Sequence, residues 1–109
     1  MTVSKNDEGS ISVEQRGHML LIGLNRPDKY NGYTPAMARQ LVAAFTQLDE
    51  SDDLFVGVLF GHGEHFTAGL DLPKWTERMA EEGEGVEGSD SLIDPMALGR
   101  ACRKPIVTA

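Results

Sequence analysis

The apolar segment LFVGVLF, residues 54–60, constrains the fold more than any other part of this 109-residue chain. It contains no polar side chain, and such a run is typical of a strand that is covered on both faces, as in parallel sheets. It is far too short to span a bilayer. The segment therefore predicts an α/β arrangement in which helices cover a sheet.

The segments before this strand predict a hairpin and a helix. Residues 11–24 contain two β-compatible runs separated at Gly17, where glycine can supply the positive φ of a turn. Thr34 and Pro35 form a helix start, because the hydroxyl can cap free N–H groups and proline has no N–H to lose. Apolar residues then recur every three or four positions as far as Asp49, so one helix face is expected to pack inward.

The segments after the strand predict two more helices and a final strand. A helix is expected to begin between Asp71 and Pro73, another to cover residues 95–103, and a buried strand to lie within residues 104–109. This order predicts an α/β fold with right-handed crossovers. A terminal strand normally has neighbours on both sides, which favours the N-terminal part of a larger domain.

The negative charge of the chain is concentrated in one segment. Five of the 17 acidic residues lie within residues 81–90, and without them the formal net charge of −7 would be −2. This glycine-rich segment is expected to be a mobile acidic loop, and residues 1–10 a disordered tail.

No strongly basic face is present, so no binding to nucleic acid or to a membrane is expected. Residues 1–10 lack the apolar run of a signal peptide, and Cys102 alone cannot form an internal disulfide, so we expect a cytoplasmic protein.

The most informative candidate for a ligand site is residues 66–72, FTAGLDL. They lie between the predicted strand and a helix start, and their small residues would let a ligand approach the backbone. Free N–H groups in a first helical turn carry partial positive charge and suit an oxyanion or a phosphate. The alternative is an ordinary strand-to-helix connection in which Asp71 caps the helix, and a catalytic role for the Asp71 carboxylate is a third interpretation.

Other residues indicate chemistry less specifically. His62 and His65 could belong to a metal site, but no third ligand lies at an obvious spacing, so surface histidines are favoured and no metal is expected. The sequence GHG at 61–63 lacks the third glycine of a dinucleotide loop. Arginines near Cys102 could activate its thiol, but no histidine is paired with it, so a buried helix cysteine is favoured.

Two motifs together resemble the crotonase superfamily, also called the enoyl-CoA hydratase/isomerase family. They are LNRPDKYN, residues 24–31, and FTAGLDL, residues 66–72, and their order and spacing agree with that family. The resemblance extends over residues 11–109 and implies the N-terminal part of a crotonase-like fold, a spiral of ββα units. Gly32 and Tyr33 depart from the alanine and leucine that commonly follow the asparagine, and Tyr33 could reshape the acyl or adenine pocket.

The resemblance implies an acyl-CoA thioester substrate whose carbonyl oxygen is held by two backbone N–H groups. The first donor would be the N–H of Leu70. The CoA would lie along the backbone of Ala68, Gly69, Leu70, Asp71 and Leu72. Lys29 and Gly32 would line the opposite side of the CoA. In the family, the second donor and the carboxylates that move protons follow a strand like residues 104–109.

The resemblance thus implies an enzyme, most simply a 2-enoyl-CoA hydratase that holds the thioester enolate in a backbone oxyanion hole. No cofactor is expected, because coenzyme A is part of the substrate. A homotrimer or hexamer is implied for the full-length protein, and the 109 residues alone are expected to be inactive. The alternative is a non-catalytic crotonase-like module that binds acyl-CoA or a protein partner.

Overall fold

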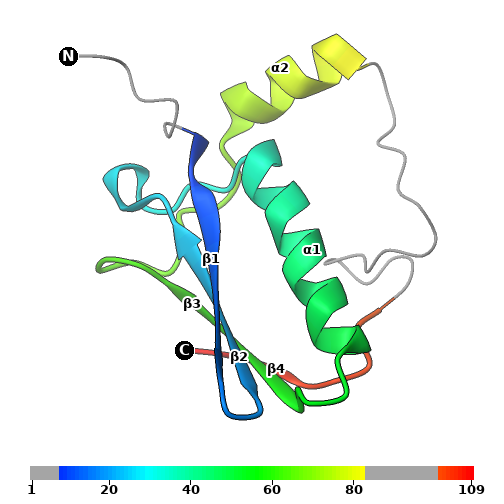
Figure 1. Cartoon of the computed structure of the whole chain (residues 1–109). Helices are drawn as coiled ribbons and strands as arrows, with labels where there is room; N and C mark the ends of the chain where they lie inside the picture. The colour runs from blue at the N-terminus through cyan, green and yellow to red at the C-terminus, as the bar shows by residue number, and fades with distance from the viewer. Residues whose placement is uncertain (1–7, 83–100) are drawn as a thin grey trace.

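The computed structural model describes residues 8–82 and 101–109 as a four-stranded sheet with helices (Figure 1). Its elements in chain order are β1 (Ser10–Arg16), β2 (Met19–Asn25), the 3-10 helix η2 (Pro27–Lys29), α1 (Pro35–Glu50), β3 (Val56–Gly61), α2 (Leu72–Glu82) and β4 (Ile106–Thr108). The predicted α/β class is confirmed. No helix in the described part of the chain is both long and apolar enough to cross a membrane.

The strands lie in the order β1-β2-β3-β4. The first two form the predicted antiparallel hairpin, and Gly17 at its turn has φ +60, a left-handed conformation that glycine adopts without strain. The pairs β2–β3 and β3–β4 are parallel. Parallel pairing places the C-terminal ends of β2 and β3 at the same edge of the sheet, so the loops that leave these two strands start side by side.

Helix α1 packs against one face of the sheet and closes the hydrophobic core. Its apolar stripe is buried with the inward residues of β1 and β2, and the core comprises Ile11, Leu20, Ile22, Leu24, Met37, Leu41, Ala44, Phe45, Leu48 and Leu54. The prediction that residues 54–60 are covered on both faces is not met by the described residues. Phe55 is 57% exposed and Val58 and Phe60 are only half-buried, because α1 covers a single face of β3.

The start of α1 is capped as expected. The Thr34 hydroxyl accepts a hydrogen bond from the N–H of Met37 at 3.2 Å and donates one to the carbonyl oxygen of Glu8 at 2.6 Å. Strand β1 already begins at Ser10. Residues 8–10 are therefore part of the fold, whereas the prediction had placed them in the tail; residues 1–7 of that tail lie outside the described residues.

Two further boundaries differ from the prediction. Helix α2 continues to Glu82, so the first two acidic residues of 81–90 are helical; the rest of that segment lies outside the described residues. Of the predicted helix 95–103, only residues 101–103 are described, and they are not helical. Cys102 is therefore a half-buried loop residue. The buried Asp49 carboxylate fixes this loop instead, accepting hydrogen bonds from the backbone N–H and Nε of Arg103 at 2.8 and 3.1 Å.

Candidate active site

The two segments that carry the sequence motifs lie against each other. The N–H of Ala68 donates to the carbonyl oxygen of Tyr30 at 2.9 Å. The N–H of Tyr33 donates to the carbonyl oxygen of Gly69 at 2.8 Å. The N–H of Asp71 in turn donates to the carbonyl oxygen of Tyr33 at 2.9 Å. These bonds form a short parallel bridge between residues 33 and 70. The loop after β2 and the loop after β3 thus hold each other in place.

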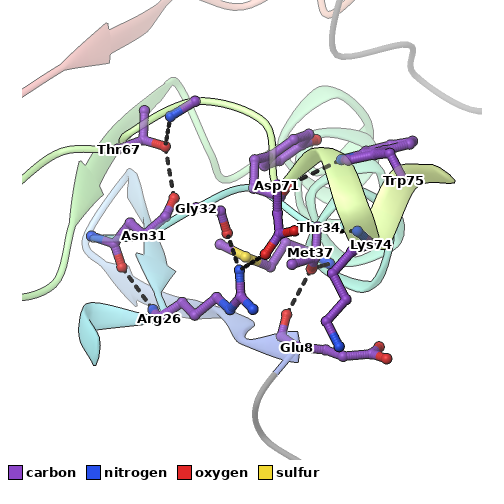
Figure 2. A network of polar contacts seen from close by, with 12 residues as sticks. Glu8, Arg26, Asn31, Gly32, Thr34, Met37, Thr67, Asp71, Lys74 and Trp75 are labelled. Atoms are coloured by element: carbon purple, nitrogen blue, oxygen red, sulfur yellow. Dashed lines mark hydrogen bonds and ion pairs between the residues drawn. The ribbon is translucent and has the colours of Figure 1, made fainter. Parts of the chain in front are cut away.

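Asn31 lies at the centre of this contact and is fully buried (Figure 2). Its side-chain oxygen accepts a hydrogen bond from the N–H of Arg26 at 2.7 Å, and its side-chain nitrogen donates to the carbonyl oxygens of His62 and His65 at 2.9 and 2.8 Å. Asn31 has φ +55 and its neighbour Tyr30 has φ +54. Asparagine tolerates this left-handed region better than most residues. Asn31 belongs to the first motif but had no predicted role, although an asparagine within a turn segment is a signal for such a conformation.

An ion pair between a buried arginine and a half-buried aspartate joins the same loop to the start of α2. The Nη1 atom of Arg26 lies 2.7 Å from Oδ2 of Asp71 and donates to the carbonyl oxygen of Gly32 at 3.2 Å. The Arg26 side chain is 4% exposed and that of Asp71 20%. The other carboxylate oxygen of Asp71 accepts from the N–H of Lys74 at 3.2 Å, so Asp71 caps α2.

These contacts determine the charge state of Asp71. The hydrogen bond from Arg26 is the largest influence, and it holds the pKa of the Asp71 carboxyl below its ordinary value of 3.8 although partial burial opposes it. The carboxylate is therefore ionised at neutral pH and fully engaged by its partners. This arrangement favours the capping interpretation over a catalytic one. The cap is among the interpretations that the sequence offers for Asp71, whereas nothing in the sequence indicates Arg26 as its partner.

Backbone N–H groups in residues 68–72 differ in whether they already have an acceptor. Those of Ala68 and Asp71 donate to carbonyl oxygens of the facing loop, and that of Gly69 donates to the Thr67 hydroxyl at 3.1 Å. Those of Leu70 and Leu72 meet no hydrogen-bond acceptor among residues 8–82 and 101–109. Within these residues, the Leu70 N–H thus has hydrogen-bonded neighbours on both sides and no acceptor of its own. Such a fixed donor next to a helix N-terminus can stabilise an oxygen that becomes negatively charged.

An aromatic pair supports this donor. The indole N–H of Trp75 donates to the carbonyl oxygen of Tyr33 at 2.9 Å, and the two rings stack with centroids 6.1 Å apart. Tyr33 packs against the hydrophobic core, and burial raises its pKa to about 12, so its phenol stays neutral at physiological pH. Tyr33 therefore has a structural role: its backbone pairs with the segment that contains Leu70.

The remaining predicted residues lie at the edge of this arrangement. Lys29 is exposed on η2. Gly32 is buried, and an added Cβ would lie 3.2 Å from Nη1 of Arg26, so the missing side chain makes room for the ion pair. The predicted roles of Lys29 and Gly32 in substrate binding stay predictions.

The two histidines of the loop make separate contacts. Nε2 of His62 is hydrogen-bonded to the Ser12 hydroxyl at 2.8 Å, whereas His65 packs edge-on against the ring of Tyr30. Within the part of the chain that the structure describes, no three His, Cys, Asp or Glu residues are grouped as metal ligands. The contacts of the two histidines attach the loop to its surroundings.

Gly61 allows the loop after β3 to fold back over the strand, which leads to a testable prediction. A Cβ at Gly61 would lie 2.5 Å from the carbonyl oxygen of Phe66 and 2.6 Å from that of His65, so Gly61→Ala must displace the loop backbone. We expect a loss of about 2 kcal/mol in the free energy of unfolding. Amide hydrogen exchange of Ala68, followed by mass spectrometry or NMR, should become faster.

Gly57→Ala is the matched control, since it makes the same change in the same strand. Its Cβ would lie 2.7 Å from the Cδ2 atom at the tip of the Leu48 side chain, within the core and away from the loop. It should be destabilising without faster exchange at Ala68. Equal exchange rates in the two variants would contradict the proposed close approach at Gly61.

The chain is similar to known proteins over most of its length. The sequence model described as Enoyl-CoA hydratase/isomerase matches residues 14–109. Enoyl-CoA hydratase EchA19 of Mycobacterium tuberculosis is 35% identical over 99 residues, which cover 89% of this chain and 37% of that protein. The mitochondrial Delta(3,5)-Delta(2,4)-dienoyl-CoA isomerase of Mus musculus is 38% identical over 71 residues, or 64% of this chain and 22% of the isomerase.

A solved structure gives the same result for the fold. The crystal structure of a probable enoyl-CoA hydratase/isomerase from Mycobacterium abscessus superposes with a TM-score of 0.78 at 33% sequence identity. The superposition covers 91% of this chain and 38% of that structure. The chain therefore spans less than two fifths of the length of the relatives that it matches.

Proposed function

Because the chain belongs to the enoyl-CoA hydratase/isomerase family, we propose that the whole protein processes an acyl-CoA thioester. The simplest reaction is the addition of water to a 2-enoyl-CoA. Coenzyme A enters as part of the substrate, and the proposal needs no separate cofactor.

The observation that carries the proposal is the N–H of Leu70, which has no acceptor among residues 8–82 and 101–109. When a nucleophile adds to a 2-enoyl thioester, negative charge develops on the carbonyl oxygen as the enolate forms. A preorganised donor aimed at that oxygen lowers the barrier, because it binds the charged intermediate more strongly than the neutral ground state. Leu70 needs no reactive side chain for this role, which fits an exposed aliphatic residue at the position.

The CoA portion is proposed to lie along the backbone of residues 68–72. The residues at 68 and 69 are small and exposed, so a ligand can approach the main chain there. The exposed ammonium of Lys29 is the proposed partner of a CoA phosphate. The second oxyanion donor and the proton-transferring carboxylates are assigned, as in the resembled family, to sequence that follows a strand like β4.

The test is to titrate the whole protein with crotonyl-CoA and with free coenzyme A by calorimetry, and to follow hydration of crotonyl-CoA in the same preparation. We expect binding of the thioester together with turnover. Binding without turnover of either a 2-enoyl-CoA or a dienoyl-CoA would favour the non-catalytic alternative. Absence of detectable binding to the folded protein at millimolar concentrations of either ligand would contradict the proposal.

A further inference from the structure

We propose that Asn31 is a positioning residue that fixes the Leu70 N–H in its working orientation, an inference that rests on the proposed role of that N–H. Asn31 does not need to touch the substrate. It acts on the loop that carries the donor.

The contacts of Asn31 leave little freedom to its side chain or its loop. The amide is fully buried; its oxygen accepts one hydrogen bond, and its nitrogen donates two, to His62 and His65. These are both of the hydrogens that the amide nitrogen can donate. The bonds fix the first half of the loop after β3.

The backbone of Asn31 fixes the second half of that loop. Its carbonyl oxygen accepts a hydrogen bond from the Thr67 hydroxyl at 2.7 Å, and the same hydroxyl accepts from the N–H of Gly69 at 3.1 Å. Figure 2 shows Asn31 and Thr67 in contact, and the bond from Gly69 to the Thr67 hydroxyl extends this chain of contacts to the residue next to Leu70. A shift at Asn31 therefore moves the donor without removing it.

An aspartate at position 31 tests the hydrogen bonds of the side chain separately from its shape. Asn31→Asp keeps the size of the side chain and its acceptor for Arg26, but an ionised carboxylate has no hydrogen to donate and would face two carbonyl oxygens. A protonated carboxyl regains one donor. The variant should therefore recover part of its function as the pH falls, which is not expected of Asn31→Ala.

The control is Asn25→Asp, the same chemical change at the other asparagine of the first motif. Asn25 ends β2, is half-buried, and its side chain makes no hydrogen bond within the described residues. Both variants and the unmodified protein are compared over the same pH range, because other titratable groups surround the loop. These groups are Arg26 and Asp71 at the ion pair, and His62, Glu64 and His65 in the loop itself.

The experiment measures kcat and KM for crotonyl-CoA with the whole protein. At about pH 8, Asn31→Asp should lower kcat about 100-fold, with KM changed by less than about threefold, because a misplaced donor costs transition-state stabilisation. At about pH 5 the loss relative to the unmodified protein should shrink to about tenfold. A purely structural role would lower the melting temperature and the folded fraction but leave kcat per folded molecule unchanged, and that result would overturn the proposal.

Hydrogen exchange of the Ala68 and Gly69 amides provides a readout that does not depend on activity. Asn31→Asp at about pH 8 should exchange these amides at least about tenfold faster than Asn25→Asp at the same pH. Faster exchange supports the positioning role even if crotonyl-CoA proves not to be a substrate, in which case only the proposed function fails. Unchanged exchange overturns the positioning role whether or not the protein is active.

Discussion

Replacing Leu70 by proline is expected to lower kcat for an enoyl-CoA about 10²- to 10³-fold while changing KM by less than about threefold. Proline removes the first of the two proposed donors, which acts mainly on the charged intermediate. The bridge to Tyr33 uses the carbonyl oxygen of Gly69 and the N–H of Asp71, so no hydrogen bond of the described residues is lost. Steady-state kinetics on the whole protein, with circular dichroism to check folding, measures the effect.

Leu70→Ala is the control for this substitution. It removes a side chain that is 54% exposed and keeps the backbone N–H. We expect its kcat to stay within a few-fold of the unmodified protein. If alanine and proline lowered kcat equally, the side chain and not the N–H would be responsible, and Leu70 would not be an oxyanion donor.

Removing the carboxylate of Asp71 should have the largest effect on stability. Asp71→Ala is expected to lower the free energy of unfolding by about 3 kcal/mol at neutral pH, because the buried Arg26 guanidinium loses a charged partner and α2 loses its cap. Urea unfolding monitored by circular dichroism measures the change. Asp71→Asn is the matched control, since asparagine caps helices well and removes only the charge.

The contribution of the ion pair should depend on pH in a defined direction. The pKa of Asp71 is lowered in the folded state, so the folded protein holds the ionised form more strongly than the unfolded chain does. The stability gained is therefore complete above about pH 5, and it is lost as the pH falls through the lower folded-state pKa. The difference in unfolding free energy between the unmodified protein and Asp71→Asn should shrink over that range. A difference that stays constant to low pH would exclude the ion pair as its source.

The regular elements could be predicted because their signals are local. The apolar stripe and the Thr34 cap locate α1 to within one residue at its C-terminal end, and Gly17 locates the hairpin turn. Coverage of β3 could not be predicted in the same way. An apolar run shows that a strand can be buried on both faces, but not which segments of the chain bury it.

The candidate site was found only in part. Residues 66–72 were identifiable because small residues before a helix start are a local pattern. The partners of the site were not, because Arg26 and Asp71 are 45 positions apart, and Asn31 and His65 are 34 apart. A buried arginine or asparagine has the same sequence signature as an exposed one, so the contacts that hold Leu70 emerge only from the fold.

The left-handed backbone at Tyr30 and Asn31 has a consequence for the order in which the protein folds. Each such conformation costs a non-glycine residue about 1 kcal/mol, and several of the bonds that offset this cost come from residues 31 to 36 positions later in the chain. The turn after β2 is therefore expected to reach its final shape only after β3 has paired with β2 and the loop after β3 has come into contact with the turn. Contacts that are distant in sequence form late, since the intervening chain must first lose entropy. A chain with a complete hydrophobic core would then still lack a fixed Leu70 N–H, and the proposed ability to bind a thioester oxygen would arise only in the last step of folding.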